Sequence, residues 1–325
     1  MGIKNLNKYL LDKCNKTSIQ KIHLSKISGK TIVIDTSIYL YQFVSMNALL
    51  ENMYLMISLL KNYDITPIFI FDGKPPPEKN ELLMKRSYDK KDAEGKYKLL
   101  QNKLENETDR SLHKQIIIEM DSLKRQFVRV YSDDITRVKK LMKAYGVMYY
   151  DAIREADELC AYLTNKKDLW GCMSDDMDMF LYGCKVILRN LSLKNHTIMI
   201  YNTNDILNDL EMDPHDFCEV MVLSGTDYNI TCDTNLFETM KLYTEYKIYT
   251  KQQEQSHDKS IDFYIWLLKK TKYIKDYGLL LKAYRMFQGE LFDDYANSVF
   301  EVSKQIKFDM DIVNEIMKDD GFIIS

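Results

Sequence analysis

Short, continuous apolar runs alternate with longer segments of helical spacing between residues 31 and 190. Helical spacing is clearest at 49–63 and 135–145, and the apolar runs lie at 31–35, 66–72, 146–151, 169–174 and 185–190. Strands without polar alternation are typical of a sheet whose two faces are both covered by helices. The pattern therefore predicts an α/β fold with a mostly parallel central sheet flanked by helices.

Two long segments depart from this alternation. Residues 78–130 are rich in Lys, Glu, Asp and Asn and contain almost no Gly or Pro, which predicts a helical insertion, either a solvated surface element or a mobile arch over a site. After about residue 233 the chain has helical spacing to its end, with apolar stretches at 266–268 and 279–281. The expected organisation is a core at 1–232, comprising 1–77, the insertion and 131–232, followed by a helical region at 233–325.

The composition is that of a globular protein. The chain has 325 residues, of which 46% are apolar and 29% charged, and its apolar runs are shorter than a membrane span. The six Cys and five His are scattered without a Cys-x-x-Cys pair, which disfavours a zinc site or a disulfide framework. Gly2 invites comparison with an N-myristoylation motif, but Leu6 stands where that motif has Ser or Thr. We expect a cytoplasmic protein without a membrane partner.

Acidic residues close several of the apolar runs. Asp35 ends the first run and Asp72 the second, while Asp176 and Asp178 follow the fourth. The carboxyl ends of parallel strands meet at one edge of a sheet, so these side chains should converge. Further acids, which open a helical run or follow a later apolar run, are Glu155, Asp157 and Asp227. Acids in a first helical turn are also common without any function.

A cluster of this kind needs a counter-charge, because carboxylates repel one another strongly in a poorly solvated site. Mg²⁺ binds a few carboxylates together with water and phosphate oxygens. A dense acid cluster is therefore typical of a two-metal phosphoryl-transfer site. A phosphatase of the haloacid dehalogenase type needs a second Asp two residues after Asp35, but Ser37 stands there.

At these residues the sequence resembles the flap endonuclease family, the structure-specific 5′ nucleases. The similar segments, in the family's order, are the opening Met-Gly-Ile, Ile34-Asp35-Thr-Ser, Phe71-Asp72-Gly-Lys-Pro-Pro, Glu155-Ala-Asp157, Asp175-Asp176-Met-Asp178 and Gly225-Thr-Asp227-Tyr. The family has Glu-Ala-Glu at the fourth segment, so Asp157 is a shortened acid here. The similar segments span residues 1–228.

The resemblance implies two Mg²⁺ ions, which Mn²⁺ is expected to replace, and DNA with branched, flapped or broken ends as the partner. It implies metal ligands at the seven positions Asp35, Asp72, Glu155, Asp157, Asp176, Asp178 and Asp227. The catalytic Lys and Arg at the base of the family's helical arch correspond to Lys79 and Arg86. The alternative interpretation is that both are ordinary basic residues on the surface. Tyr41 matches an aromatic beside the scissile nucleotide, with a core Tyr as the alternative, and Gly2 is expected near the site.

Two family features are not evident in the sequence. After Tyr228 the family carries a Gly-rich hairpin that binds a monovalent ion and grips duplex DNA, but residues 229–240 contain no Gly. The paired aromatics of a sliding-clamp box are missing after Gln305. With a complete acid set, these differences make the chain most similar to the poxvirus members of the family. That similarity implies replication, recombination and double-strand break repair of viral DNA in the host cytoplasm, with viral replication proteins as candidate partners.

The favoured hypothesis is a Mg²⁺-dependent DNA phosphodiesterase in which residues 78–130 arch over a single strand. The alternative is a junction-binding scaffold with weak or no cleavage, which the altered hairpin and the short Asp157 favour. An RNA-cutting enzyme with a related α/β fold is a third hypothesis. The net charge of −3 includes the seven acids, so the rest of the chain is net positive, as a nucleic-acid partner requires.

Overall fold

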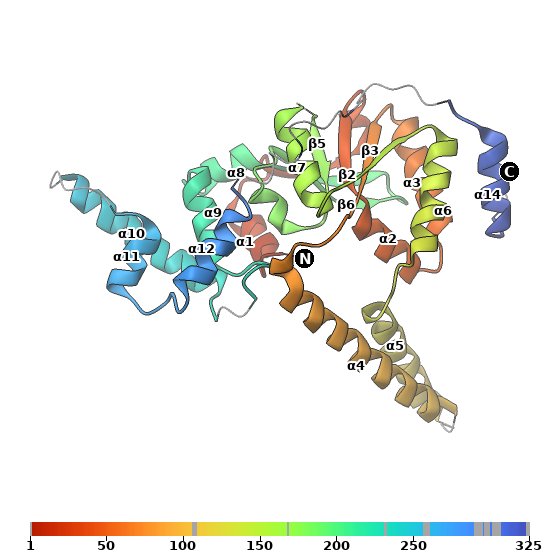
Figure 1. Cartoon of the computed structure of the whole chain (residues 1–325), viewed down its shortest axis with the longest axis horizontal. Coiled ribbons are helices and arrows are strands. Elements are labelled where there is room, and N and C mark those ends of the chain that lie inside the picture. Colours follow the sequence, from red (N-terminus) through yellow and green to blue (C-terminus); the bar gives the residue numbers. More distant parts are fainter. Residues whose placement is uncertain are drawn as a thin grey trace.

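A seven-stranded sheet forms the centre of the structure, a computed structural model that describes residues 2–105, 109–167, 169–230, 233–255, 261–288, 295, 300 and 307–322 (Figure 1). The strand order is β1-β7-β6-β5-β2-β3-β4. Neighbouring strands from β6 to β4 are parallel, whereas β7 runs antiparallel to both β6 and β1. The strands are β1 Ile19–His23, β2 Thr31–Asp35, β3 Thr66–Phe71, β4 Met148–Asp151, β5 Gly171–Met173, β6 Val186–Ser192 and β7 Thr197–Asn202. The predicted α/β fold with a mostly parallel sheet is confirmed.

The five predicted strands are present, and two that the sequence pattern missed extend one edge of the sheet. In β1, Ile19 is buried and most other side chains are partly or fully exposed. In β7, Ile198 and Tyr201 are buried while their neighbours are half-buried. Strand β1 is at the edge of the sheet and β7 is next to it, and the partly exposed side chains of both interrupt the continuous buried apolar run that marks a strand covered on both faces. The pattern that located the central strands therefore could not locate these two.

Helices cover both faces of the sheet. Ile34 and Phe69 face α2, α3 and α6, whereas Val33 and Ile70 pack with α1, α7 and α9. Successive strand residues thus enter two different hydrophobic cores, which explains the unbroken apolar runs. The helices around the sheet, including the short helix α8, are α1 Leu6–Lys13, α2 Thr36–Ser45, α3 Leu49–Asn62, α6 Ser132–Tyr145, α7 Ala156–Lys166, α8 Thr203–Asp209 and α9 Pro214–Leu223.

The predicted helical insertion is a hairpin of two helices that projects from the sheet (Figure 1). The short helix η2 (Pro77–Lys79) leads into α4 (Asn80–Glu105), and α5 (Arg110–Gln126) returns along it. Tyr97 and Phe127 pack edge to face, with ring centres 5.4 Å apart. Arg129 forms an ion pair with Glu94 at 3.1 Å. These contacts keep the two helices together although most of their surface is exposed.

The C-terminal helices lie at two separate places (Figure 1). Helices α10 (Leu236–Gln255), α11 (Phe263–Lys270) and α12 (Tyr277–Arg285) pack near α9, where Leu267 and Leu280 are buried. Helix α14 (Met310–Asp319) lies at the other end of the molecule against α6, and the Asp309 N–H donates to the Ala144 carbonyl at 2.8 Å. No described helix is both long enough and apolar enough to cross a membrane.

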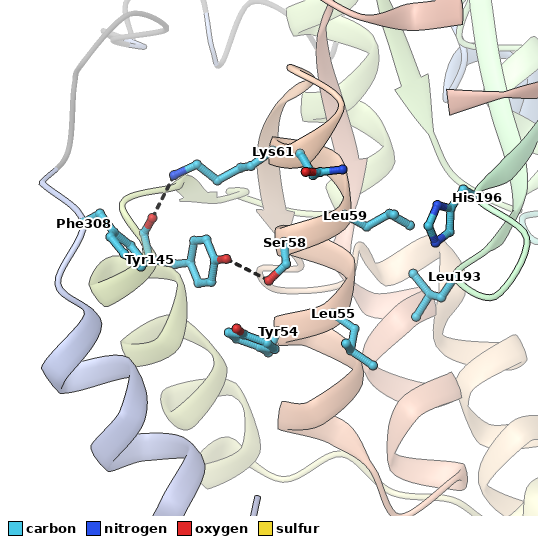
Figure 2. Close-up of a pocket in the computed structure, with 10 residues that line it drawn as sticks. Tyr54, Leu55, Ser58, Leu59, Lys61, Tyr145, Leu193, His196 and Phe308 are labelled. Carbon is cyan, nitrogen blue, oxygen red and sulfur yellow. Dashed lines mark hydrogen bonds between the residues drawn. The ribbon is translucent and has the colours of Figure 1, made fainter. Parts of the chain in front are cut away.

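A groove of about 730 Å³ lies between α3, the end of α6 and the segment before α14 (Figure 2). Lys61 Nζ donates to the Tyr145 carbonyl at 3.1 Å, and Ser58 Oγ lies 2.7 Å from the Tyr145 hydroxyl. These bonds tie α3 to α6. None of the seven predicted acids lines the groove, so it is separate from the strand ends that carry the candidate chemistry.

Candidate active site

Three of the predicted acids lie at the carboxyl ends of neighbouring strands. Asp35 ends β2 and caps α2, where its Oδ1 accepts the Ser37 N–H at 3.1 Å. Asp72 follows β3 and accepts the N–H of Ala156 at 2.8 Å. Asp176 follows β5 and caps the short helix η3 (Met177–Phe180). Because β5, β2 and β3 are adjacent in the sheet, their ends lie side by side.

Other acids reach this edge from a helix and a turn. Glu155 is the N-cap of α7, and Asp157 lies in the first turn of that helix. Asp227 lies in the turn that follows α9. Lys79 contacts two of them, since its Nζ is 2.6 Å from Glu155 Oε2 and 3.9 Å from Asp227 Oδ2. One lysine thus joins the α7 side of the site to the α9 side.

Burial and mutual repulsion raise the pKa of four of the acids, Asp35, Asp157, Asp176 and Asp178. For Asp35, burial is the main cause, the charge of Asp72 adds to it, and the pKa rises to about 8. The charge of Asp176 raises it further, while the Ser174 hydroxyl, which donates to Asp35 at 3.1 Å, lowers it. An acid in this position is stabilised in its charged form when a cation binds beside it.

The pKa values of Asp157, Asp176 and Asp178 are raised as well, in each case mainly by burial. Repulsion from Asp35 and Asp176 adds to the effect on Asp157. Repulsion from Asp176 and Asp227 adds to the effect on Asp178. Carboxylates that lie far apart in the sequence therefore interact directly, and the fold gathers the predicted acids at one edge of the sheet.

Two carboxylate oxygens in this cluster, Asp157 Oδ1 and Asp178 Oδ1, are buried and have no hydrogen-bond partner within the described part of the chain. Leaving a charged oxygen buried without a donor or a cation is costly. The predicted ligands are all carboxylates, which suits a hard divalent ion such as Mg²⁺ or Mn²⁺. The residues present therefore fit the ions that the sequence predicts.

Both predicted cations reach the acids. Lys79 is buried at the base of the arch. Burial is the largest single influence on its pKa and lowers it, but Glu155, Asp157 and Asp227 together raise the pKa by more, so that the net shift is upward. Arg86 donates to Asp227 Oδ2 at 2.7 Å from the first turns of α4. The two residues are seven positions apart, about two helical turns, so both project toward the same side. The structure thus places positive charge inside the carboxylate cluster.

Gly2 lies against two of the acids. A Cβ on Gly2 would be 2.4 Å from Asp176 Oδ1 and 2.4 Å from Asp178 Oδ1, and its φ of +74° is one that side chains disfavour. We expect Gly2→Ala to displace these carboxylates and to slow metal-dependent cleavage by about 10²-fold, measured in single turnover. Gly95→Ala in α4 is the matched control, because a Cβ there meets nothing within 4 Å. Equal rates for the two variants would contradict the prediction.

Gly73 marks a close approach of two backbone segments. A Cβ on Gly73 would be 2.0 Å from the Ala152 carbonyl oxygen, and its N–H donates to the Arg154 carbonyl at 2.6 Å. This bond holds the segment before Glu155 to the end of β3. We expect Gly73→Ala to lower the free energy of unfolding by about 2 kcal/mol through overpacking. Urea denaturation would measure the loss, and an unchanged midpoint would show that the segment relaxes freely.

Tyr41 lies beside the arch. Its side chain is 44% exposed on α2, and Lys90 Nζ lies 4.9 Å from the centre of its ring. The alternative, a core Tyr, is therefore wrong. A hollow of about 540 Å³ adjoins the ring and is lined by Tyr41, Leu83, Arg86, Ser87, Lys90, Lys91 and Arg129. The stacking role implied by the family resemblance remains a prediction, but the ring is accessible for it.

Two polar residues outside the predicted set hold the acids in place. Ser174 donates to Asp35 and accepts the Asp176 N–H at 3.2 Å, so it links two strand ends. The Tyr228 hydroxyl donates to Glu155 Oε2 at 2.8 Å, and its ring centre is 5.0 Å from Lys79 Nζ. Tyr228 directly follows Asp227 in the sequence, and Ser174 lies two residues before Asp176. That proximity is the signal that could have singled them out, although a lone Ser or Tyr is ambiguous.

Asn229 stabilises the turn that carries Asp227, in the segment without the family's Gly-rich hairpin. It is 1% exposed, accepts the Thr226 N–H at 2.6 Å and donates to the Val222 carbonyl at 2.9 Å. A buried amide therefore closes this turn, which also contains Gly225 at a φ of +104°. Part of the hairpin and of the clamp-box predictions falls on residues 231–232 and 305–306, which lie outside the described residues.

The chain belongs to the XPG class of proteins, because two family models of that class match it. The model of the XPG N-terminal domain matches residues 1–93, and that of the XPG I-region matches residues 146–227. These two ranges contain all seven acids together with Gly2, Tyr41, Lys79 and Arg86.

Among the relatives, the probable RAD2-like endonuclease 369L of Invertebrate iridescent virus 6 is 30% identical, and the match covers 70% of this chain and 67% of that protein. Flap endonuclease 1 of Encephalitozoon cuniculi is 32% identical, and the match covers 70% of this chain and 68% of that protein. Flap endonuclease 1 of Aedes aegypti is 29% identical, and the match spans 72% of this chain and 62% of that protein. The chain belongs to the family of flap endonucleases and RAD2-like endonucleases, as its motifs predict.

Solved structures confirm the fold. The catalytic core of Rad2 in complex with DNA substrate superimposes with a TM-score of 0.63 at 21% identity, covering 99% of this chain and 95% of that one. Human GEN1 in complex with Holliday junction DNA gives a TM-score of 0.60 at 18% identity, covering 98% of this chain and 73% of that one. The 5′-nuclease fold of these proteins is thus shared by this chain over almost its whole length.

Proposed function

We propose that this chain is a Mg²⁺-dependent, structure-specific DNA nuclease that hydrolyses phosphodiester bonds with two metal ions. The observation that carries the proposal is the convergence of seven carboxylates at one sheet edge, with Lys79 and Arg86 among them. Membership of a family of DNA endonucleases supports the same class of reaction.

The arrangement of the acids supports two ions rather than one. Asp157 interacts with Asp35 and Asp176, while Asp178 interacts with Asp176 and Asp227. Each of these two groups contains one buried oxygen without a partner among the described residues, and Asp176 belongs to both. Bound ions supply Lewis-acid chemistry, in which the phosphoryl group is polarised and a water is activated. The acids of this chain hold the charge and fix its position.

Lys79 and Arg86 have two roles in this proposal. In the absence of ions they neutralise Glu155 and Asp227. Once ions neutralise the acids, the two cations can stabilise the negative charge that develops on the transferred phosphate. Arg86 is suited to this exchange because its side chain is 41% exposed and lies at the entrance to the arch.

A single strand fits the hollow beside the arch. Positive charge is concentrated there, since Lys90, Lys91, Arg86 and Arg129 line the hollow. Burial and the charges of Arg129 and Arg86 lower the pKa of Lys90. Cations that follow a backbone, next to an exposed aromatic ring such as Tyr41, suit an unpaired nucleic-acid strand. The complexes of Rad2 with DNA substrate and of human GEN1 with Holliday junction DNA support DNA as that nucleic acid.

We extend the proposal to a role in viral DNA replication, homologous recombination and double-strand break repair in the host cytoplasm. Its support is the similarity to a probable RAD2-like endonuclease of an iridescent virus. The resemblance to poxvirus members of the family, inferred from the sequence, stays a prediction. Viral replication proteins are the partners expected for such a role.

The test is cleavage of end-labelled DNA by the purified protein with Mg²⁺ or Mn²⁺. A 5′ flap, a splayed duplex, a four-way junction and a plain duplex serve as substrates, with Asp72→Asn and Asp176→Asn as controls. We expect metal-dependent products from a branched substrate that both variants lose. Binding of branched DNA by a folded protein without any cleavage would overturn the nuclease and establish the scaffold instead.

A further inference from the structure

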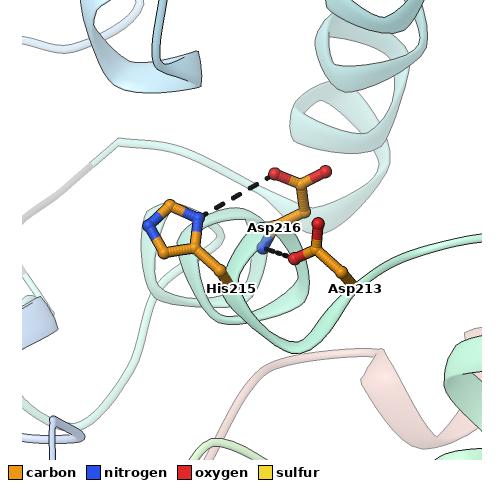
Figure 3. Close-up of side chains that lie close together, drawn as sticks. All are labelled: Asp213, His215 and Asp216. Carbon is orange, nitrogen blue, oxygen red and sulfur yellow. Dashed lines mark hydrogen bonds and ion pairs between the residues drawn. The ribbon is translucent and has the colours of Figure 1, made fainter.

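A second cluster of metal-ligating side chains lies at the beginning of α9. Figure 3 shows His215 there beside Asp213 and Asp216. His215 Nδ1 is 4.0 Å from Asp216 Oδ1 and 3.9 Å from Glu219 Oε2. Asp262, the N-cap of α11, supplies another carboxylate, and ligand atoms of His215, Glu219 and Asp262 all lie within 4.8 Å of one another.

Glu219 distinguishes this cluster from an ordinary group of surface acids. Its side chain is 4% exposed, and its Oε2 has no hydrogen-bond partner in the described ranges. That same oxygen faces His215 Nδ1. Ligand atoms of Glu219 and Asp262 lie within 4.8 Å of each other. Two carboxyl groups this close are stabilised either by a shared proton or by a cation between them.

The other two acids of the cluster already have partners. Asp213 Oδ1 accepts the Asp216 N–H at 2.8 Å and so caps α9. Asp216 Oδ2 accepts the Tyr243 hydroxyl at 2.5 Å and lies 3.7 Å from Lys247 Nζ. Asp262 Oδ1 likewise accepts the Tyr264 N–H at 2.9 Å, which leaves its other carboxylate oxygen for an ion. The unpartnered Glu219 oxygen belongs to the group of His215, Glu219 and Asp262, so these three residues are the candidate ligands.

We propose that His215, Glu219 and Asp262 form a binding site for a divalent transition-metal ion, Zn²⁺ or Mn²⁺, that ties α9 to α11. One imidazole nitrogen and two carboxylate oxygens suit these ions, whereas Mg²⁺ takes oxygen ligands. His215 and Glu219 stand one helical turn apart on α9, so both face the N-terminus of α11. Since Asp227 lies in the turn after α9, the ion stabilises the helix from which that turn begins. The site is separate from the seven acids at the sheet edge.

The experiment measures Zn²⁺ binding by calorimetry and by thermal unfolding against an EDTA reference. The full chain with Asp176→Asn is used, so that the acids at the sheet edge bind less metal. We expect a Zn²⁺ site that excess Mg²⁺ does not displace and that raises the melting temperature by a few degrees. Adding His215→Ala or Asp262→Asn should weaken this binding at least about tenfold. His113→Ala, on α5 of the arch, is the matched control and should leave it unchanged.

Equal Zn²⁺ affinity and stoichiometry in the His215→Ala and His113→Ala proteins would overturn the proposal. It would also be overturned if the parent protein, the full chain with Asp176→Asn, bound no Zn²⁺. Glu219→Gln separates the ion from a shared proton. If Glu219 and Asp262 only share a proton, the Glu219→Gln variant has a higher melting temperature than its parent. In that case Zn²⁺ raises the melting temperature of neither the variant nor the parent, which contradicts the proposal. Loss of the Zn²⁺-induced rise in the Gln variant alone supports it. Cleavage with Mg²⁺ should persist in an otherwise unmodified His215→Ala protein, because this site is not the catalytic one.

Discussion

Replacing Asp178 by Asn should lower the rate of Mg²⁺-dependent DNA cleavage by about 10³-fold or more, because a metal site contributes several kcal/mol to transition-state stabilisation. Asp178 is 4% exposed, and its Oδ1 is a buried oxygen without a hydrogen-bond partner among the described residues. Asn keeps the shape of the side chain and removes its charge. Since Asp176 and Asp227 repel Asp178, the metal-free variant should also be more stable, by about 1 kcal/mol.

Single-turnover cleavage and thermal unfolding, each with Mg²⁺ and with EDTA, measure both effects. Asp175→Asn is the matched control, since it makes the same charge change in the same acidic run. Asp175 Oδ1 accepts the N–H of Asn190, a residue of β6, at 2.8 Å. The control should cleave at nearly the parent rate and keep the stabilisation by Mg²⁺. An Asp178→Asn protein that behaved in the same way would remove Asp178 from the metal site.

Lys79→Met should slow cleavage by about 10²-fold to 10³-fold, the usual loss when a group that stabilises transition-state charge is removed. Its effect on stability should have the opposite sign to that of Asp178→Asn. The side chains of Lys79 and Glu155 are 11% and 14% exposed, and their charged atoms are 2.6 Å apart. Removing the lysine leaves buried carboxylates uncompensated, so the metal-free protein should lose about 3 kcal/mol. Mg²⁺ should restore much of this loss.

Two variants serve as controls for Lys79→Met. Lys79→Arg keeps the charge and should retain most of the stability in EDTA. Lys98→Met breaks the ion pair with Glu94 on the arch, where the lysine side chain is 68% exposed, and should cost at most about 1 kcal/mol. If Lys79→Met were as stable in EDTA as Lys98→Met, the lysine would not compensate the acids. Full cleavage activity in Lys79→Met would remove it from the catalytic machinery.

The sequence alone determined the central strands and the identity of the acids. Apart from Asp35, strands β2 and β3 are apolar at every buried position because their side chains enter two cores, and such runs are visible without a structure. Asp35 and Asp72 stand at the ends of those runs, and parallel pairing alone places such ends at one edge. The length and polarity of residues 78–130 likewise marked the helical arch. These features are local, so local patterns reveal them.

The tertiary structure alone decided which charges meet. The contacts of Lys79 with Glu155 and of Arg86 with Asp227 join segments that no local pattern connects. The same holds for Ser174, which joins two strand ends, and for Glu219, whose buried oxygen faces a histidine one turn away and an acid from another helix. Burial and distance set the strength of each interaction between charges, and both are properties of the packed chain. The sequence therefore names the acids, while the fold determines which of them repel, which are neutralised and where a cation is needed.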